Sequence, residues 1–153
     1  MPVNAKYVHT NIVARDWNRL AEFYENVFGC TRLPPERDYE GAWINDVTAL
    51  EEEVTLRGIH LRLPGHGDRG PTLEIFEYSI EPDCPPHAVN QRGFSHIAFH
   101  VDDVPTDRQA VLDAGGSDLG KLHTMDVAGA GTITLIYMMD PEGNIIELQT
   151  WSK

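Results

Sequence analysis

The chain has 153 residues, of which 41% are hydrophobic, so it is long enough for one domain with a real core. Its 24 acidic and 12 basic residues give a formal net charge of −12, which disfavours nucleic acid and anionic membrane surfaces as partners. The sequence lacks a signal-peptide pattern, a membrane-length apolar stretch and a C-x-x-C motif, so we expect a cytoplasmic protein whose two cysteines are free thiols.

Alternation of apolar and polar residues predicts strands along much of the chain. In chain order these strands cover residues 7–13, 59–63, 73–78, 95–101, 132–139 and 145–151, with a further strand expected around 41–47. Helical spacing predicts one helix over 16–28, begun by Asp16 and ended by Gly29, and another over 105–114. The glycine-rich segment 120–131 is expected to be a mobile loop, and residues 140–144 a tight turn.

The sequence also contains an internal repeat. His9 stands seven residues before Asp16 and the first helix, and His96 stands seven residues before Asp103 and the second helix. Near the end of each half, an apolar residue precedes a glutamate in a strand, as Glu74 and Glu147. We therefore expect one domain over 1–153, built from a module at about 1–80, a proline-rich linker at 81–93, and a second module at about 94–153. Each module is predicted to run strand, helix, then three strands.

The repeated histidines and glutamates share one kind of face. Side chains alternate between the two faces of a strand, and all four residues lie opposite the apolar positions that would pack under a helix. A sheet curled around that face would gather two imidazoles and two carboxylates, contributed by His9, Glu74, His96 and Glu147. Nitrogen and oxygen ligands without sulfur suit Zn, Ni, Co, Mn or Fe(II). We therefore expect one divalent metal ion per chain.

Other residues on these faces are candidates for the substrate pocket, because they surround the ligands with apolar area and a few polar groups. They are Asn11, Phe76, Tyr78, His100, Gln149 and Trp151. His100 lies four residues beyond His96, roughly 13 Å along a strand, which is too far to bind the same ion. The other histidines lie in or beside polar or Pro/Gly-rich stretches and are expected to be surface groups: His60, His66, His87 and His123.

At these residues the chain resembles the vicinal oxygen chelate superfamily, which includes glyoxalase I, methylmalonyl-CoA epimerase, extradiol dioxygenases, and fosfomycin and bleomycin resistance proteins. The resemblance rests on VHTNIVARDWNRLAEFYENVFGC, PTLEIFEY, GFSHIAFHVDDV and DPEGNIIELQ. It implies an α+β fold of two βαβββ modules, which form a U-shaped mixed sheet around the metal with the helices on the outer face. It also implies a homodimer.

The two-histidine, two-glutamate set is similar to that of glyoxalase I. The resemblance thus implies a lyase or isomerase, glyoxalase-like or epimerase-like, that transfers a proton next to a carbonyl of a small molecule through a metal-stabilised enediolate. In that mechanism Glu147 is the base or a ligand, and Glu74 is its counterpart across the metal. Glyoxalase I usually has arginine where this chain has Val13, which makes glutathione doubtful.

Two other activities stay open at this point. An Fe(II) extradiol-type dioxygenase would need only two histidines and one carboxylate, which His9, His96 and Glu147 could supply with Glu74 left unbound. A drug-binding resistance protein without catalysis would bind its ligand on the same curled face of the sheet without a metal, and the intact ligand set disfavours it.

Overall fold

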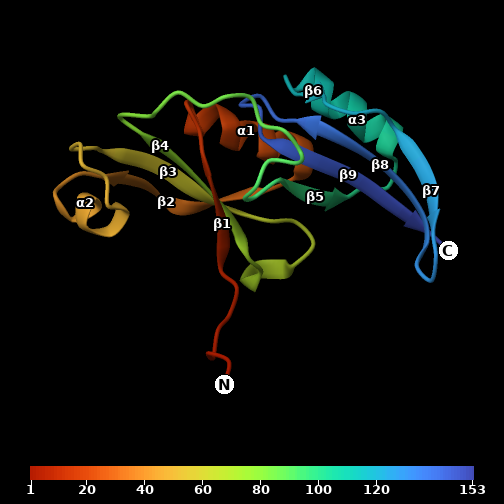
Figure 1. Cartoon of the computed structure of the whole chain (residues 1–153), viewed down its shortest axis with the longest axis horizontal. Coiled ribbons are helices and arrows are strands. Elements are labelled where there is room, and N and C mark those ends of the chain that lie inside the picture. The colour runs from red at the N-terminus through yellow and green to blue at the C-terminus, as the bar shows by residue number, and fades with distance from the viewer. The chain divides into compact units, whose positions relative to one another are not determined.

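The computed structural model describes residues 1–153, which form two compact units, 1–83 and 84–153 (Figure 1). The first unit contains β1 (His9–Val13), α1 (Trp17–Phe28), β2 (Thr31–Tyr39), α2 (Trp43–Thr48), β3 (Leu56–Arg62), the 3-10 turn η1 (Gly67–Arg69) and β4 (Thr72–Tyr78). The second unit contains β5 (His96–His100), α3 (Val104–Asp113), β6 (Ser117–Asp118), β7 (His123–Val127), β8 (Gly131–Met139) and β9 (Ile145–Ser152). No helix is long and apolar enough to cross a membrane.

Each unit has its own mixed sheet. In the first, the strand order is β1-β4-β3-β2, with β1 parallel to β4 and the other pairs antiparallel. In the second, β5 is parallel to β9, β9 pairs antiparallel with β8, and β8 also pairs with β6 and β7. The α+β class and the repeated βαβββ modules are confirmed, with α2 and the two-residue β6 as additions. The segment 81–93 contains no helix or strand.

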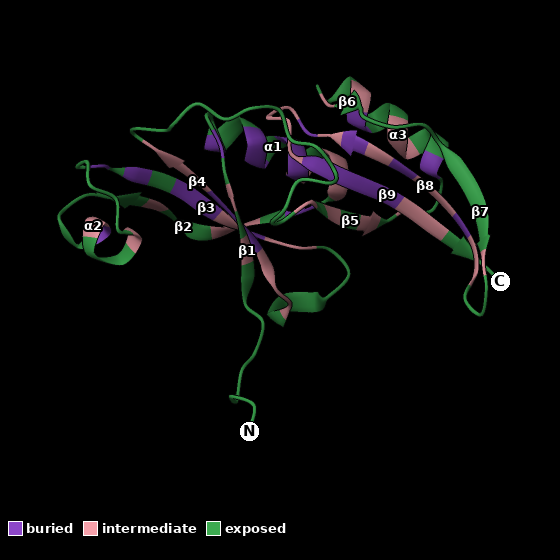
Figure 2. Cartoon of the chain, viewed as in Figure 1, coloured by how far each residue is buried: buried purple, intermediate pink, exposed green.

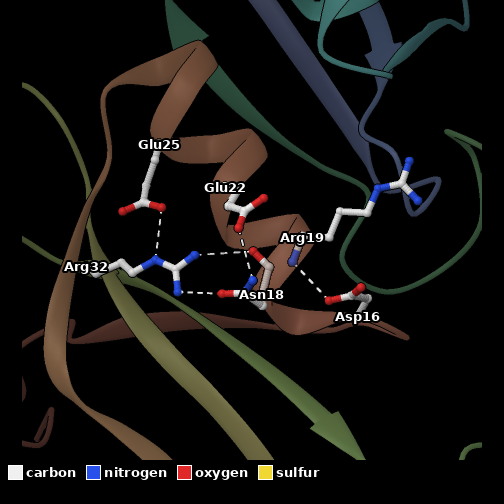
Figure 3. Close-up of polar contacts among 6 residues, drawn as sticks. All are labelled: Asp16, Asn18, Arg19, Glu22, Glu25 and Arg32. Carbon is white, nitrogen blue, oxygen red and sulfur yellow. Dashed lines mark hydrogen bonds and ion pairs between the residues drawn. The ribbon is translucent and has the colours of Figure 1, made fainter.

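The first helix forms where the sequence predicts it. The Asp16 side chain accepts a hydrogen bond from the Arg19 backbone N–H at 3.0 Å (Figure 3). Gly29 ends the helix at φ +70°. Arg32 of β2 ties the helix to the sheet, because its guanidinium donates to Glu25 at 2.9 Å and to the Asn18 side chain at 2.7 Å. The opposite face of the helix contacts β3 and β4. Its buried residues are Trp17, Leu20, Ala21, Phe23 and Tyr24, and Figure 2 shows buried stretches along α1 in purple.

The expected strand at 41–47 was wrong. This segment contains helix α2, and the second strand of the unit is β2, at Thr31–Tyr39. Two adjacent prolines, Pro34 and Pro35, make the β2 sequence untypical of a strand, because proline cannot donate a ladder hydrogen bond. The structure accommodates them because β2 is an edge strand, and its register with β3 breaks between Leu33 and Arg37.

The expected mobile loop at 120–131 was also wrong in part. Residues 123–127 form β7, which pairs with β8 through five residues. Four of the five β7 residues are exposed, so the strand lacks the alternation of buried and exposed residues that predicts a strand. Backbone pairing with β8, and not burial, defines this strand.

The turn between β8 and β9 is confirmed and has an unusual acidic centre. Asp140 is only 3% exposed, and its carboxylate accepts hydrogen bonds from the backbone N–H of Glu142 at 2.9 Å and of Asn144 at 3.0 Å. The Asn144 amide donates to the same carboxylate, and Gly143 supplies the positive φ of +84°. This turn sets the register that places Glu147 on β9.

Asp140→Ala is expected to lower the free energy of unfolding by about 1–3 kcal/mol, because it leaves the half-buried N–H groups of Glu142 and Asn144 without this acceptor. Denaturant unfolding followed by circular dichroism measures this change. Asp102→Ala, at an exposed position, serves as the control. Equal stability of the two variants would contradict the role given to the Asp140 carboxylate.

Candidate functional site

Three adjacent strands of the first unit bring together two imidazoles and one carboxylate. Glu74 lies on β4, between β1 and β3. His60 of β3 stands directly opposite it in the ladder, and its Nε2 lies 2.5 Å from Glu74 Oε2. On β1, His9 Nε2 lies 3.3 Å from the other carboxylate oxygen, Oε1. The ligand atoms of these three residues all lie within 4.8 Å of one another.

The Glu74 carboxylate is buried and well partnered. The residue is 8% exposed, and Asn11, its ladder partner on β1, donates from Nδ2 to Oε1 at 3.0 Å. Burial of a charge is costly unless such partners compensate, so this side chain is fixed in place by its neighbours. The arrangement leaves a charged oxygen pair facing two imidazoles.

His60 is held from its other side as well. Its Nδ1 lies 2.8 Å from the Thr72 hydroxyl, and its side chain is 17% exposed. Burial lowers the pKa of His60, the charges of Arg37 and His9 lower it further, and the Glu74 carboxylate opposes them. The net direction favours the neutral imidazole, which is the form that binds metals.

The second unit repeats the pair but not the trio. His96 Nε2 on β5 lies 3.0 Å from Glu147 Oε2 on β9, and Glu147 is 7% exposed. The ladder partner of Glu147 on β8 is Tyr137, whose ring centroid lies 4.9 Å from that of His96. Burial raises the pKa of the Tyr137 phenol, and the Glu147 carboxylate adds to this. Tyr137 therefore stands where the first unit has His60.

The register makes the two pairs equivalent. His9 pairs with Thr72, two residues before Glu74, and His96 pairs with Ile145, two residues before Glu147. Each repeated histidine thus meets the repeated glutamate of its own unit across the parallel strand pair. One difference lies beside them: where Asn11 faces Glu74, the second unit has Ala98.

The structure places the remaining predicted site residues as follows. Asn11 binds Glu74, and the rings of Phe76 and Tyr78 pack against a buried apolar cluster of Ile44, Val54 and Leu56. Burial and the nearby Glu74 carboxylate raise the pKa of the Tyr78 phenol. In the second unit, the indole N–H of Trp151 donates to the Gln149 side chain at 2.6 Å, and His100 is exposed at the end of β5.

The expectation that His60 is a surface group was wrong. Its neighbours Ile59 and Leu61 are buried, each less than 2% exposed. His60 therefore lies on the opposite face of β3, toward Glu74. The alternation that assigned faces to the other ligands carries the same signal here. It was masked by the polar composition of the flanking residues, Arg57 and Arg62.

The donor set fits a divalent metal. Imidazole nitrogens and a carboxylate oxygen suit Zn and the neighbouring transition metals, and three protein ligands leave positions for water or substrate. The group His9, His60 and Glu74 could therefore hold a metal ion. Such an ion would supply a positive charge beside any substrate oxygen that approached it.

A family model for the glyoxalase/bleomycin resistance protein/dioxygenase superfamily matches residues 6–148, nearly the whole chain. The chain belongs to this superfamily. No curated protein sequence matches it significantly.

Solved structures of glyoxalase superfamily proteins share the fold of this chain. A glyoxalase family protein from Bacillus cereus matches with a TM-score of 0.78 and 19% identity, covering 100% of both chains. The fosfomycin resistance protein FosX from Listeria monocytogenes matches with a TM-score of 0.60 and 16% identity, covering 99% of this chain and 94% of its own. A glyoxalase family protein from Enterococcus faecalis gives 0.59 and 20%, covering 96% and 98%. At these identities the likeness concerns the fold.

Proposed function

We propose that this glyoxalase superfamily protein is a divalent-metal-dependent lyase or isomerase, glyoxalase-like or epimerase-like, that transfers a proton next to a carbonyl of a small molecule. The observation that carries the proposal is the repeated pair of a histidine and a buried carboxylate, present once in each unit at the same register. Metal binding alone would not require the second buried carboxylate. Proton transfer beside a metal does require a group that accepts the proton, and a carboxylate can serve as that group.

The proposed roles follow from the chemistry of each group. The proposed ligands are the residues that the sequence repeat indicates: His9, Glu74, His96 and Glu147. A bound divalent cation would stabilise the negative charge that grows on a carbonyl oxygen when a neighbouring proton leaves. Glu147 takes that proton from carbon and returns it, and His96, 3.0 Å away, orients the carboxylate.

A second candidate function is an Fe(II) extradiol-type dioxygenase. The observation that favours it is the composition of the first-unit cluster, because two histidines and one carboxylate form the usual ligand set of non-haem Fe(II) oxygenases. In that reaction oxygen is consumed and no proton acceptor such as Glu147 is required beside the ligands. The two candidates therefore differ in a directly measurable co-substrate.

The test is an exchange experiment in D₂O with metal-loaded protein. Mass spectrometry of 2-oxo acids and acyl-CoA thioesters would show deuterium at the carbon next to the carbonyl if the protein transfers protons there. Parallel reactions with catechols and Fe(II) are followed with an oxygen electrode. Oxygen uptake with ring cleavage, and no exchange, would replace the proton-transfer proposal with the dioxygenase.

The same proposal includes a cytoplasmic homodimer, which is the common assembly of the superfamily and not a feature of the residues discussed above. Light scattering of the purified protein measures the assembly directly. A mass of about 34 kDa, twice that of the 17.2 kDa chain, is expected.

A further inference from the structure

We propose that His60 is a metal ligand, so that β1, β3 and β4 of the first unit hold a divalent cation through His9, His60 and Glu74. The inference rests on the proposed function only in requiring that the chain binds a divalent metal. It adds a ligand from strand β3, and it gives the first unit three of the residues that bind the ion.

The geometry of the three side chains supports this assignment. His9 and His60 approach different oxygens of one carboxylate, at 3.3 Å and 2.5 Å, and all ligand atoms lie within 4.8 Å. Ligands at about 2.0–2.2 Å from a common ion lie at most about 4.4 Å apart. The widest separation in the cluster must therefore close slightly, and the 2.5 Å contact between His60 and Glu74 must lengthen to admit the ion. The imidazoles meet edge to face with centroids 5.2 Å apart, so neither ring blocks the other.

The second nitrogen of His60 has the partner that a metal-binding histidine needs. An imidazole that binds a metal through one nitrogen almost always hydrogen-bonds through the other, which sets its tautomer and orientation. Here Nδ1 lies 2.8 Å from the Thr72 hydroxyl, while Nε2 is directed at the Glu74 carboxylate. With Nδ1–H donated to Thr72, Nε2 presents its lone pair toward the Glu74 carboxylate, and a cation held between the two groups would accept it.

The second unit shows that this third ligand is not required by the fold. Its equivalent strands carry the same histidine and glutamate, His96 and Glu147, but Tyr137 stands at the position of His60. A neutral phenol is a poor ligand compared with an imidazole. The third nitrogen donor is therefore specific to the first unit.

Two variants at position 60 distinguish a ligand from a simple hydrogen-bond partner of Glu74. His60→Ala and wild-type protein are titrated with Zn²⁺ by calorimetry, with His123→Ala as the control for loss of an exposed histidine. His60→Cys is titrated with Co²⁺, because a thiolate ligand adds a sulfur-to-cobalt charge-transfer band. Wild-type protein, with free Cys30 and Cys84, supplies the background spectrum.

We expect His60→Ala to bind Zn²⁺ at least about 10-fold more weakly than wild type, since even partners outside the ligand shell change affinity by about 10–100-fold. His123→Ala should bind as wild type does, and His60→Cys should show the charge-transfer band. Wild-type affinity in His60→Ala, together with no band in His60→Cys, would overturn the inference while leaving the proposed function intact. A wild-type protein that binds no divalent ion would overturn both.

Discussion

Replacing Glu147 with glutamine is expected to slow the proposed proton transfer by about 10²–10⁴-fold. Glutamine has the same shape and can still contact His96, which lies 3.0 Å from the carboxylate, but its amide does not accept a proton at neutral pH. The rate of deuterium incorporation from D₂O into the substrate measures the loss. Circular dichroism of the variant checks that the buried position tolerates the amide.

Glu51→Gln is the matched control for this experiment, since Glu51 is exposed in the first unit and takes no part in the site. Its exchange rate should equal that of wild type. If Glu147→Gln keeps a rate within about threefold of wild type, Glu147 is not the base. A different group of the protein would then have to take the proton in the exchange reaction.

Replacing Glu74 with glutamine is expected to weaken metal binding by at least about 100-fold, beyond the effect of changing a supporting residue. The carboxylate is the only negative charge in the cluster, and two imidazoles with one neutral amide attract a divalent cation far less. Asn11 donates to Oε1 and can donate equally to an amide oxygen, so the variant should fold. Zn²⁺ titration by calorimetry measures the change in affinity.

Glu77→Gln provides a control on the same strand. Glu77 accepts a hydrogen bond from the backbone N–H of Trp17 at 3.1 Å, and an amide oxygen can accept this bond as well. Wild-type metal affinity is expected. Unchanged affinity in Glu74→Gln would show that Glu74 is not a ligand, and would favour the triad of His9, His96 and Glu147.

The parts of the fold with regular patterns could be predicted from the sequence. The helix at Trp17–Phe28 has a strong apolar stripe between Asp16 and Gly29, and the paired β1 and β4 alternate in polarity. The internal repeat then related His9 to His96, and Glu74 to Glu147. The helix and strand signals are local, because each depends only on residues that are close together in the sequence.

The missed elements depend on contacts that no local pattern encodes. β2 contains two prolines that only an edge position permits, and β7 is an exposed strand defined by its pairing with β8. The site shows the same limit. His60 reaches Glu74 because β3 pairs with β4 in one particular register, and that register depends on contacts between residues far apart in the sequence.

Elemental analysis of the protein purified without added metal, alongside His9→Ala, tests the central claim most directly. His9 Nε2 lies 3.3 Å from the Glu74 carboxylate, and its loss removes one of the proposed imidazole ligands. We predict about one divalent ion per wild-type chain, and a much smaller amount in the variant. A wild-type protein that carries no divalent metal, and takes up none on addition of Zn²⁺, Mn²⁺ or Fe²⁺, would contradict the account.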